Sequence, residues 1–272
     1  MRDPRASEWV KRHPSVRPPR LRLLCLPHAG GSPAFFHEWG RRFGDDVEVL
    51  VARYPGRHER INDPLVTSMD QLADELTLAL GQFTDLPLAV FGHSMGASLG
   101  YEVALRLLRQ RGVRLAALMV SGRTPPHLAD DTLPDADDVD AVVAEVRRLG
   151  GTDAALLDDP DLRELVLPAL LADFKAVRGY TPRASVALPF PVIAYVGDVD
   201  PDVDAACMGE WARASSVDFA LTVLPGDHFY LVGRRAELIR DIRTRLAALG
   251  LAEKPGAGGG ETAPRGAASL PR

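Results

Sequence analysis

Short apolar segments alternate with helical patterns along most of this 272-residue sequence, and this alternation constrains the fold more than any other feature. The segments that predict strands are Leu21–Leu26, Val47–Ala52, Leu88–Phe91, Leu115–Val120, Val192–Val196 and Ala220–Leu224. They are largely apolar on both faces and bounded by turn residues, which is typical of strands covered on both sides. The segments that predict helices are Ala34–Phe43, Met69–Phe83, Met95–Arg111, Ala205–Ala214 and Arg234–Leu249. This order predicts an α/β fold with a mainly parallel central sheet and helices on both faces.

One stretch, from about residue 126 to 185, interrupts the alternation. It contains no good strand pattern, whereas Asp137–Leu149 and Asp161–Val177 have helical patterns. Asp161 and Glu164 lie near the start of the second helix, where acidic side chains suit the helix dipole. We therefore expect a helical lid inserted over a site at the edge of the sheet. The alternative is an ordinary crossover with extra helices.

The two ends of the chain differ from its interior. Residues 1–20 are charged and proline-rich and predict an irregular arm. Residues 251–272 are rich in glycine and proline and predict a disordered tail, because they cannot bury enough apolar surface. Between these ends, residues 21–250 are expected to form a single domain.

Composition excludes several classes of protein. The net charge of −5 does not suggest a general nucleic-acid binder. No apolar run approaches the roughly 18 residues that cross a bilayer, and the N-terminus lacks the apolar core of a secretion signal. Cys25 and Cys207 are too few for a disulfide framework, and Cys25 lies in an apolar run that predicts burial. We expect a cytoplasmic monomer with neither nucleic-acid nor membrane partners.

The residues Gly92-His93-Ser94-Met95-Gly96 form a G-x-S-x-G motif between a predicted strand and a predicted helix. In this context the motif forms the sharp turn of the α/β-hydrolase fold, with the serine exposed at its apex. The glycines leave room for neighbouring backbone, and the N-terminus of the helix favours the negative charge of acyl transfer. We therefore predict that Ser94 is a catalytic nucleophile and that His93 has a packing role.

The histidines after Ser94 are the candidates for its general base, because in this fold the acid and then the histidine follow the nucleophile. They are His127 and His228. His127 lies at the start of the predicted lid, too early in the chain. His228 follows the strand Ala220–Leu224 in a loop, where the base is expected, and is therefore predicted as the base. Without Ser94, a solvated loop histidine would be the default interpretation.

Four aspartates after the strand Val192–Val196 compete for the role of the acid. They are Asp198, Asp200, Asp202 and Asp204. Asp198 could fix the turn, and Asp202 or Asp204 could cap the helix that begins near Ala205. Spacing alone does not choose among the four. These alternative roles leave Asp200 at the loop apex as the favoured candidate, without excluding the others. The segment lacks the glycine and distal glutamate of a calcium loop, so no metal is expected.

A tetrahedral intermediate also needs two hydrogen-bond donors for its oxyanion. The backbone N–H of Met95, after the nucleophile, is the first candidate. The second is the N–H of Ala29, in the loop Pro27-His28-Ala29-Gly30-Gly31 that follows the first predicted strand. Glycines in that loop let the backbone approach a substrate carbonyl.

Taken together, these motifs resemble the type II thioesterases, the discrete editing enzymes of modular polyketide and nonribosomal peptide synthesis. The similarity covers about residues 21–249. It is carried by Pro27-His28-Ala29-Gly30-Gly31 with Phe35 and Phe36, by Tyr54-Pro55-Gly56-Arg57, by the Ser94 motif, by Ser121-Gly122-Arg123, by Gly197-x-x-Asp200 and by Gly226-Asp227-His228-Phe229. The Gly-x-x-Asp match selects Asp200 as the acid, and the Gly-Asp-His-Phe match supports His228.

The resemblance implies a substrate class and a binding partner. Substrates would be acyl thioesters on the phosphopantetheine arm of acyl carrier proteins, hydrolysed without a metal or organic cofactor. His28, Phe35 and Phe36 are expected to shape the acyl pocket, together with Met95 and the lid helices. The alternative for these residues is plain structural packing. Carrier proteins are usually acidic, so Arg57, Arg60, Arg123 and Arg178 are candidate docking residues.

Two other functions are the alternatives to this one. A general carboxylesterase or a chain-terminating thioesterase domain is the first; against the latter, the chain starts at Met1 and no carrier attachment motif precedes the core. A catalytically inactive hydrolase-fold receptor or scaffold is the second. It is disfavoured because Ser94, an acidic loop and His228 are all present.

Overall fold

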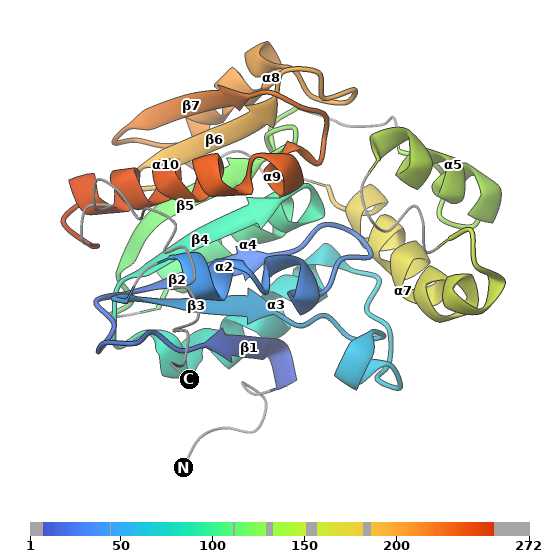
Figure 1. The fold of residues 1–272 in the computed structure, drawn as a ribbon, viewed down its shortest axis with the longest axis horizontal. Coiled ribbons are helices and arrows are strands. Elements are labelled where there is room, and N and C mark those ends of the chain that lie inside the picture. Colours follow the sequence, from blue (N-terminus) through green and yellow to red (C-terminus); the bar gives the residue numbers. More distant parts are fainter. Residues whose placement is uncertain are drawn as a thin grey trace, which may run out of the picture.

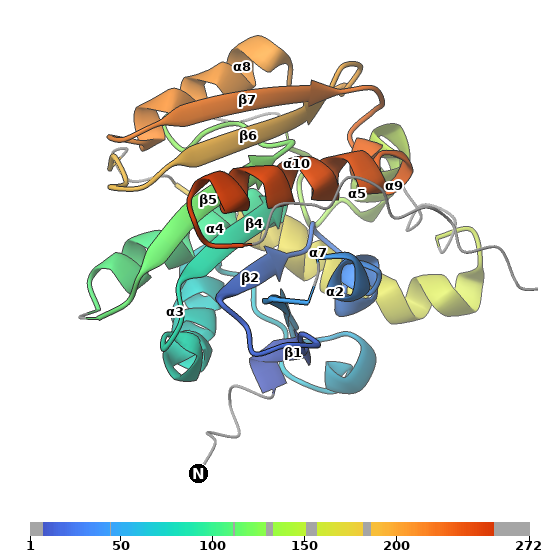
Figure 2. The same cartoon turned by 60° about the vertical axis from the view of Figure 1, so that its left-hand side comes forward.

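A central sheet with the strand order β1-β3-β2-β4-β5-β6-β7 organises the structure (Figures 1 and 2). The computed structural model describes residues 8–43, 45–110, 112–128, 133–150, 157–181 and 186–252. The strands are β1 (Val10–His13), β2 (Leu21–Leu26), β3 (Val47–Ala52), β4 (Leu88–His93), β5 (Leu115–Ser121), β6 (Val192–Gly197) and β7 (Phe219–Leu224). β1 is antiparallel to β3, and the other neighbouring pairs are parallel. The predicted mainly parallel sheet is confirmed.

The helices follow the predicted order, and most are shorter than predicted, whereas α7 extends one residue beyond its predicted range at each end. They are α2 (Trp39–Arg42), α3 (Met69–Leu80), α4 (Met95–Leu108), α5 (Val139–Leu149), α7 (Pro160–Arg178), α8 (Ala205–Gly209), α9 (Tyr230–Gly233) and α10 (Arg235–Ala248). Short 3-10 segments are η1 (Pro33–Phe36), η2 (His58–Arg60), η3 (Gly81–Phe83) and η4 (Glu210–Ala214). Three predicted helices are each divided into an α-helix and a 3-10 turn: Ala34–Phe43, Met69–Phe83 and Ala205–Ala214.

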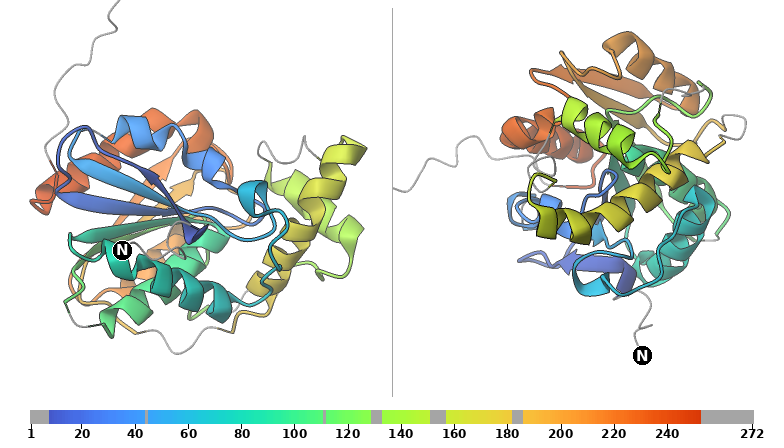
Figure 3. Two further views of the ribbon diagram at one scale, coloured as in Figure 1. Left: turned by 90° about the horizontal axis from the view of Figure 1, so that it is seen from below. Right: turned by 90° about the vertical axis from the view of Figure 1, so that its right-hand side faces the viewer.

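Alternate side chains of the strands supply two cores, one on each face of the sheet. Leu24 and Val90 pack with residues of α3 and α4. Leu23 and Phe91 point to the other face and pack with residues of α2 and α10. The view from below shows the sheet between these two helical layers (Figure 3, left). Burial on both faces explains why the strands read as nearly continuous apolar runs.

The N-terminal arm is more ordered than the sequence predicts. Residues Val10–His13 form β1 and pair with β3 in the register Val10↔Ala52. Trp9 and Val10 are buried, so the prediction of an irregular arm is wrong for this segment. The pairing covers backbone groups of β3 that would otherwise lie at an open sheet edge. The predicted C-terminal tail lies outside the described residues except for Leu251 and Ala252.

The insertion between β5 and β6 is helical, as predicted. Asp138 and Asp159 cap α5 and α7 by accepting backbone N–H bonds. Val142, Val146 and Phe174 belong to a small apolar core between these helices. Both helices lie beyond the ends of the strands, beside the sheet rather than on its faces (Figure 1; Figure 3, left). This position places them over the loops that carry the predicted site.

None of the helices in the described part of the chain is long and apolar enough to cross a membrane.

Candidate active site

Ser94 lies in a sharp turn between β4 and α4. Its backbone has φ 54° and ψ −120°, a conformation that costs free energy for a residue with a Cβ. Its N–H donates to the Ser121 carbonyl at 2.8 Å, which ties the turn to β5. A Cβ at Gly92 would lie 2.0 Å from the Gly96 oxygen, and one at Gly96 would lie 2.1 Å from the Leu26 oxygen. Both glycines of the motif are therefore required by close backbone packing.

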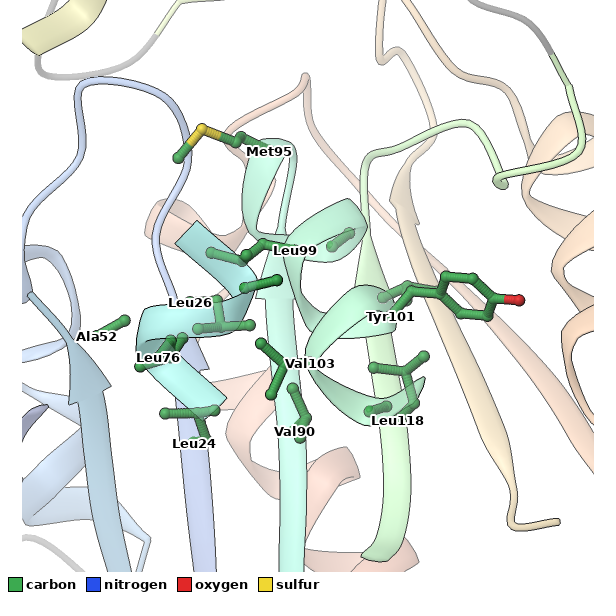
Figure 4. Packing of buried hydrophobic residues seen from close by; sticks show 14 of the residues in the cluster. Leu24, Leu26, Ala52, Leu76, Val90, Met95, Leu99, Tyr101, Val103 and Leu118 are labelled. Carbon is green, nitrogen blue, oxygen red and sulfur yellow. The ribbon is translucent and has the colours of Figure 1, made fainter. Parts of the chain in front are cut away.

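The start of α4 is held against the sheet by its apolar face. Leu99 and Val103 point toward Leu26 and Val90, and Met95 occupies the first turn beside Ser94 (Figure 4). This packing fixes the N-terminal N–H groups of the helix next to the serine. The turn, though strained, is thus supported by a buried helix on one side and a buried strand on the other.

His228 and Asp200 are brought together by the loops after β7 and β6. The Nδ1 atom of His228 lies 2.9 Å from Oδ2 of Asp200, and both side chains are almost completely buried. The Nε2 atom of His228 has no hydrogen-bond partner among the described residues. An Asp-bound imidazole with a free second nitrogen suits a general base.

Asp200 is held as a carboxylate. Burial acts to raise its pKa, but the hydrogen bond and electrostatic interaction with His228 and the N–H groups of Asp202 and Val203 outweigh burial and lower its pKa. Those two N–H groups donate to Oδ1, at 2.9 and 3.3 Å, and leave Oδ2 to His228. Asp200 thus has one oxygen for the loop and one for the histidine.

The three other aspartates of the acid loop have other partners. Asp198 accepts the Gly226 N–H at 2.8 Å, which joins the acid loop to the loop of His228. Asp202 forms an ion pair with Arg148 of α5. Asp204 caps α8 through the Cys207 N–H. Among the four aspartates that spacing alone left open, the contact with His228 favours Asp200.

The two remaining histidines of interest do not occupy the position of the base. His93 is fully buried, with its Nδ1 2.9 Å from Ser121 Oγ and its ring centroid 4.9 Å from that of His228. Burial, reinforced by the charges of His228 and His28, lowers the pKa of His93 well below its ordinary value. His93 is therefore a neutral packing residue. His127 Nε2 lies 3.6 Å from a carboxylate oxygen of Glu210.

These groups line one cavity, which α5 and α7 help to enclose. Its polar side contains Ser94, His228, Ala29 and Met95. Its apolar side is formed largely by residues of the insertion between β5 and β6, namely Leu133, Val146, Leu149, Phe174 and Val177. Within the described residues, the N–H groups of Ala29 and Met95 donate to no protein acceptor. Both are thus available to a ligand oxygen, as an oxyanion site requires.

The predicted pocket residues have different environments. His28 lines the cavity, with its ring centroid 4.8 Å from that of Phe35 and also 4.8 Å from that of Phe229. Phe35 lines a second, larger cavity on the other side of His28. Phe36 is fully buried in the core, 4.9 Å from Trp39 between ring centroids. Core packing, the alternative interpretation, describes Phe36, whose assignment to the pocket is corrected.

The four arginines considered for carrier docking also differ. The Arg57 and Arg60 side chains are only 8 % and 11 % exposed, and each pairs with an aspartate. The docking interpretation is therefore wrong for these two. Arg123 lines the cavity and donates to Ser98 Oγ, and Arg178 is half-exposed near Asp135. For Arg123 and Arg178, docking stays a prediction.

Gly122 is a residue of the site to which the sequence analysis gave no role. Its φ is +57°, and a Cβ there would lie 3.2 Å from Cε1 of His228 and 3.4 Å from Oδ2 of Asp200. It also follows Ser121, whose hydroxyl lies between His93 and the Tyr230 hydroxyl. The Ser121-Gly122-Arg123 motif was the available signal, but only the fold shows what the glycine faces.

Gly122→Ala is expected to lower kcat about 10- to 100-fold, because small displacements of catalytic groups have effects of this size. The alanine methyl would push His228, and the His93 ring beside it, by a few tenths of an ångström. Gly112→Ala is the matched control: its φ is +84°, but the added Cβ meets nothing within 4 Å. Both variants should lose about 1–2 kcal/mol of stability from the left-handed backbone. Steady-state kinetics measure this difference. Equal kcat values for the two variants would contradict the assignment of Gly122 to the catalytic site.

Comparison with known proteins extends this picture. The family model described as "Thioesterase domain" matches residues 21–246. Thioesterase PikA5 of Streptomyces venezuelae is 41 % identical over 239 residues, which are 88 % of this chain and 85 % of that protein.

Two solved structures resemble the whole fold. The type II thioesterase BorB from the borrelidin biosynthetic cluster is 34 % identical, with a TM-score of 0.81 over 88 % of this chain and 97 % of that one. YbtT, a type II thioesterase from the yersiniabactin NRPS/PKS pathway, is 28 % identical, with a TM-score of 0.79 over 89 % of this chain and 99 % of that one. The chain therefore belongs to the thioesterase domain family and has the α/β-hydrolase fold of the type II thioesterases.

Proposed function

We propose that this thioesterase releases aberrant or stalled acyl groups from the phosphopantetheine arm of carrier proteins in polyketide or nonribosomal peptide synthesis. The observation that carries the proposal is the 2.9 Å contact between His228 and Asp200 at a cavity that Ser94 also lines. The relatives support the substrate class, because YbtT is a type II thioesterase of an NRPS/PKS pathway and BorB is one of a biosynthetic cluster. The cytoplasmic location and monomeric state stay predictions of the sequence.

In this proposal Ser94, His228 and Asp200 act as one unit. Ser94 Oγ attacks the thioester carbonyl while His228 Nε2 accepts its proton, and Asp200 stabilises the imidazolium. The C–S bond breaks, the thiol leaves with the proton from His228, and the acyl group stays on Ser94. His228 then deprotonates a water that attacks the acyl-enzyme, releasing the acid and regenerating Ser94. The N–H groups of Ala29 and Met95 stabilise the oxyanion in both halves of the reaction.

The acyl group would lie against the apolar lid side of the cavity. The cavity volume is about 60 Å³. A cavity of about 150 Å³ accommodates a benzene molecule, so the space beside Ser94 suits an acyl group of a few carbon atoms better than a long chain. We therefore expect short acyl chains to be hydrolysed faster than long ones.

The test is a panel of acyl carrier proteins loaded with acetyl, propionyl, hexanoyl and decanoyl groups, compared with oxygen esters of the same acids. The expected result is higher kcat/KM for thioesters than for esters, and for acetyl and propionyl than for decanoyl. Faster cleavage of the oxygen esters would favour a general carboxylesterase instead. A wild-type protein that hydrolyses no thioester and does not react with a fluorophosphonate would favour the inactive scaffold.

A further inference from the structure

A buried ion pair joins the lid helix α7 to the body of the enzyme. Asp173 of α7 and Arg57 are 1 % and 8 % exposed, respectively. Their side chains meet through two hydrogen bonds, Arg57 Nη1 to Oδ2 at 2.7 Å and Nη2 to Oδ1 at 2.9 Å. This two-point geometry fixes both orientation and distance. The mechanism above uses neither residue.

The same pair also binds the loop that carries Ala29. Asp173 Oδ2 accepts the Gly30 N–H at 2.8 Å, and Arg57 Nη1 donates to the Gly31 carbonyl at 3.1 Å. The two residues that follow Ala29 are therefore attached to one buried network. α7 also packs directly on the loop, since a Cβ at Gly30 would lie 2.9 Å from Leu170 Cδ1.

The residue before His28 is fixed by the neighbouring Tyr54. The Tyr54 hydroxyl donates to the Pro27 carbonyl at 3.2 Å, and its ring lies 5.3 Å from the Arg57 guanidinium. The loop is thus held on both sides of His28 and Ala29. Tyr54 and Arg57 are the ends of the Tyr54-Pro55-Gly56-Arg57 motif, whose role the triad does not explain.

We propose that Asp173 and Arg57 are positioning residues that aim the Ala29 N–H at the developing oxyanion, so that the lid helix completes the oxyanion site. The inference rests on the proposed function, because it takes Ala29 as an oxyanion donor. A buried ion pair is weak evidence for stability, since apolar pairs of similar volume often stabilise as well or better. Because Asp173 and Arg57 both bind the loop that follows Ala29, the pair also fixes the position of that loop.

Asp173→Asn tests the proposal with little change in shape. The amide keeps one acceptor oxygen but turns an NH₂ group toward donors of the network. We expect kcat to fall about 10- to 100-fold, less than the roughly 10²- to 10³-fold effect of deleting an oxyanion donor outright. KM should change less than about threefold, because the lost interaction acts in the transition state. Asp158→Asn, which breaks an exposed lid ion pair with Arg147, should leave kcat unchanged.

The affinity for an alkylboronic acid reports on the oxyanion site itself. It would not change if Asp173 only stabilised the fold. Its boron accepts an electron pair from Ser94 Oγ, the serine proton passes to His228, and a boronate oxygen occupies the oxyanion site. Its affinity should fall in parallel with kcat in Asp173→Asn. The kinetic pKa in the pH profile of kcat/KM should match that of the wild type, because the triad is untouched. Unchanged boronate affinity would overturn the proposal.

A double variant separates positioning from folding. Arg57→Met with Asp173→Leu replaces the pair by apolar side chains and leaves no lone buried charge. This variant should fold, by circular dichroism, and still show the loss in kcat and boronate affinity. A folded double variant with wild-type kcat would refute the positioning role. If the wild type does not hydrolyse carrier-bound thioesters, the substrate proposal fails, but boronate binding still tests Asp173.

Discussion

Ser94→Ala is expected to abolish thioester hydrolysis and leave the fold intact. Loss of a nucleophile that acts as a unit with its base and acid costs roughly a million-fold in kcat in a serine hydrolase. What remains, roughly 10³- to 10⁴-fold above the uncatalysed rate, would come from the oxyanion site and substrate binding. Single-turnover hydrolysis of an acyl carrier protein measures this loss, and fluorophosphonate labelling should disappear with it.

The matched control is Ser68→Ala, at the N-cap of α3. The Ser68 hydroxyl accepts the Gln71 N–H, so its loss should cost about 1 kcal/mol of stability and leave kcat unchanged. Ser94→Gly adds a second check, because glycine relieves the positive φ of the turn. That variant should be inactive but more stable than Ser94→Ala by about 1 kcal/mol in thermal unfolding. Retention of more than a few per cent of kcat in Ser94→Ala would exclude Ser94 as the nucleophile.

The sequence predicted the sheet because its strands are buried on both faces and therefore read as apolar runs. β1 was missed because it is an edge strand whose charged residues, Lys11 and Arg12, obscure its pattern. Helix lengths were overestimated where a 3-10 turn continues an α-helix, as at Gly81–Phe83. The spacing of apolar residues does not distinguish the hydrogen bonds of an α-helix from those of a 3-10 helix.

The site was predictable where a residue's role follows from its place in the chain. Ser94 directly follows β4 and His228 lies in the loop after β7, and the carboxyl ends of parallel strands converge at one edge of a sheet. Spacing could not choose Asp200, because its histidine partner comes from the loop after β7. Arg57 and Asp173 are 116 residues apart in sequence, so nothing local showed that they form a buried pair. Arginine is mostly exposed in proteins, which made docking the natural interpretation of Arg57.

Asp200→Asn is expected to reduce kcat by about 10⁴-fold while preserving the shape of the acid loop. The loss of kcat depends on the orientation of the new side-chain amide. Oδ1 of Asp200 accepts N–H bonds from Asp202 and Val203, so the amide oxygen should keep that position. The amide NH₂ would then face Nδ1 of His228, which becomes an acceptor. The imidazole proton moves to Nε2, which can no longer take the proton of Ser94.

Asp204→Asn is the control for this prediction, because asparagine caps a helix about as well as aspartate. It changes the same loop and the same atom type, and both kcat and stability should stay at wild-type values. A large loss of kcat in Asp204→Asn together with an active Asp200→Asn would reverse the assignment of the acid.

The acid side of the stability profile gives an independent test of Asp200. Its pKa is lowered in the folded protein, so its contribution to stability is complete above about pH 5, where the unfolded carboxyl is ionised, and is lost as the pH falls through the folded pKa. Thermal unfolding of the wild type should therefore lose more stability between about pH 5 and 2 than that of Asp200→Asn, which has no proton to bind at this position. Equal slopes for the two proteins would mean that Asp200 is not held as a buried carboxylate, and the argument for its role in orienting His228 would fail with it.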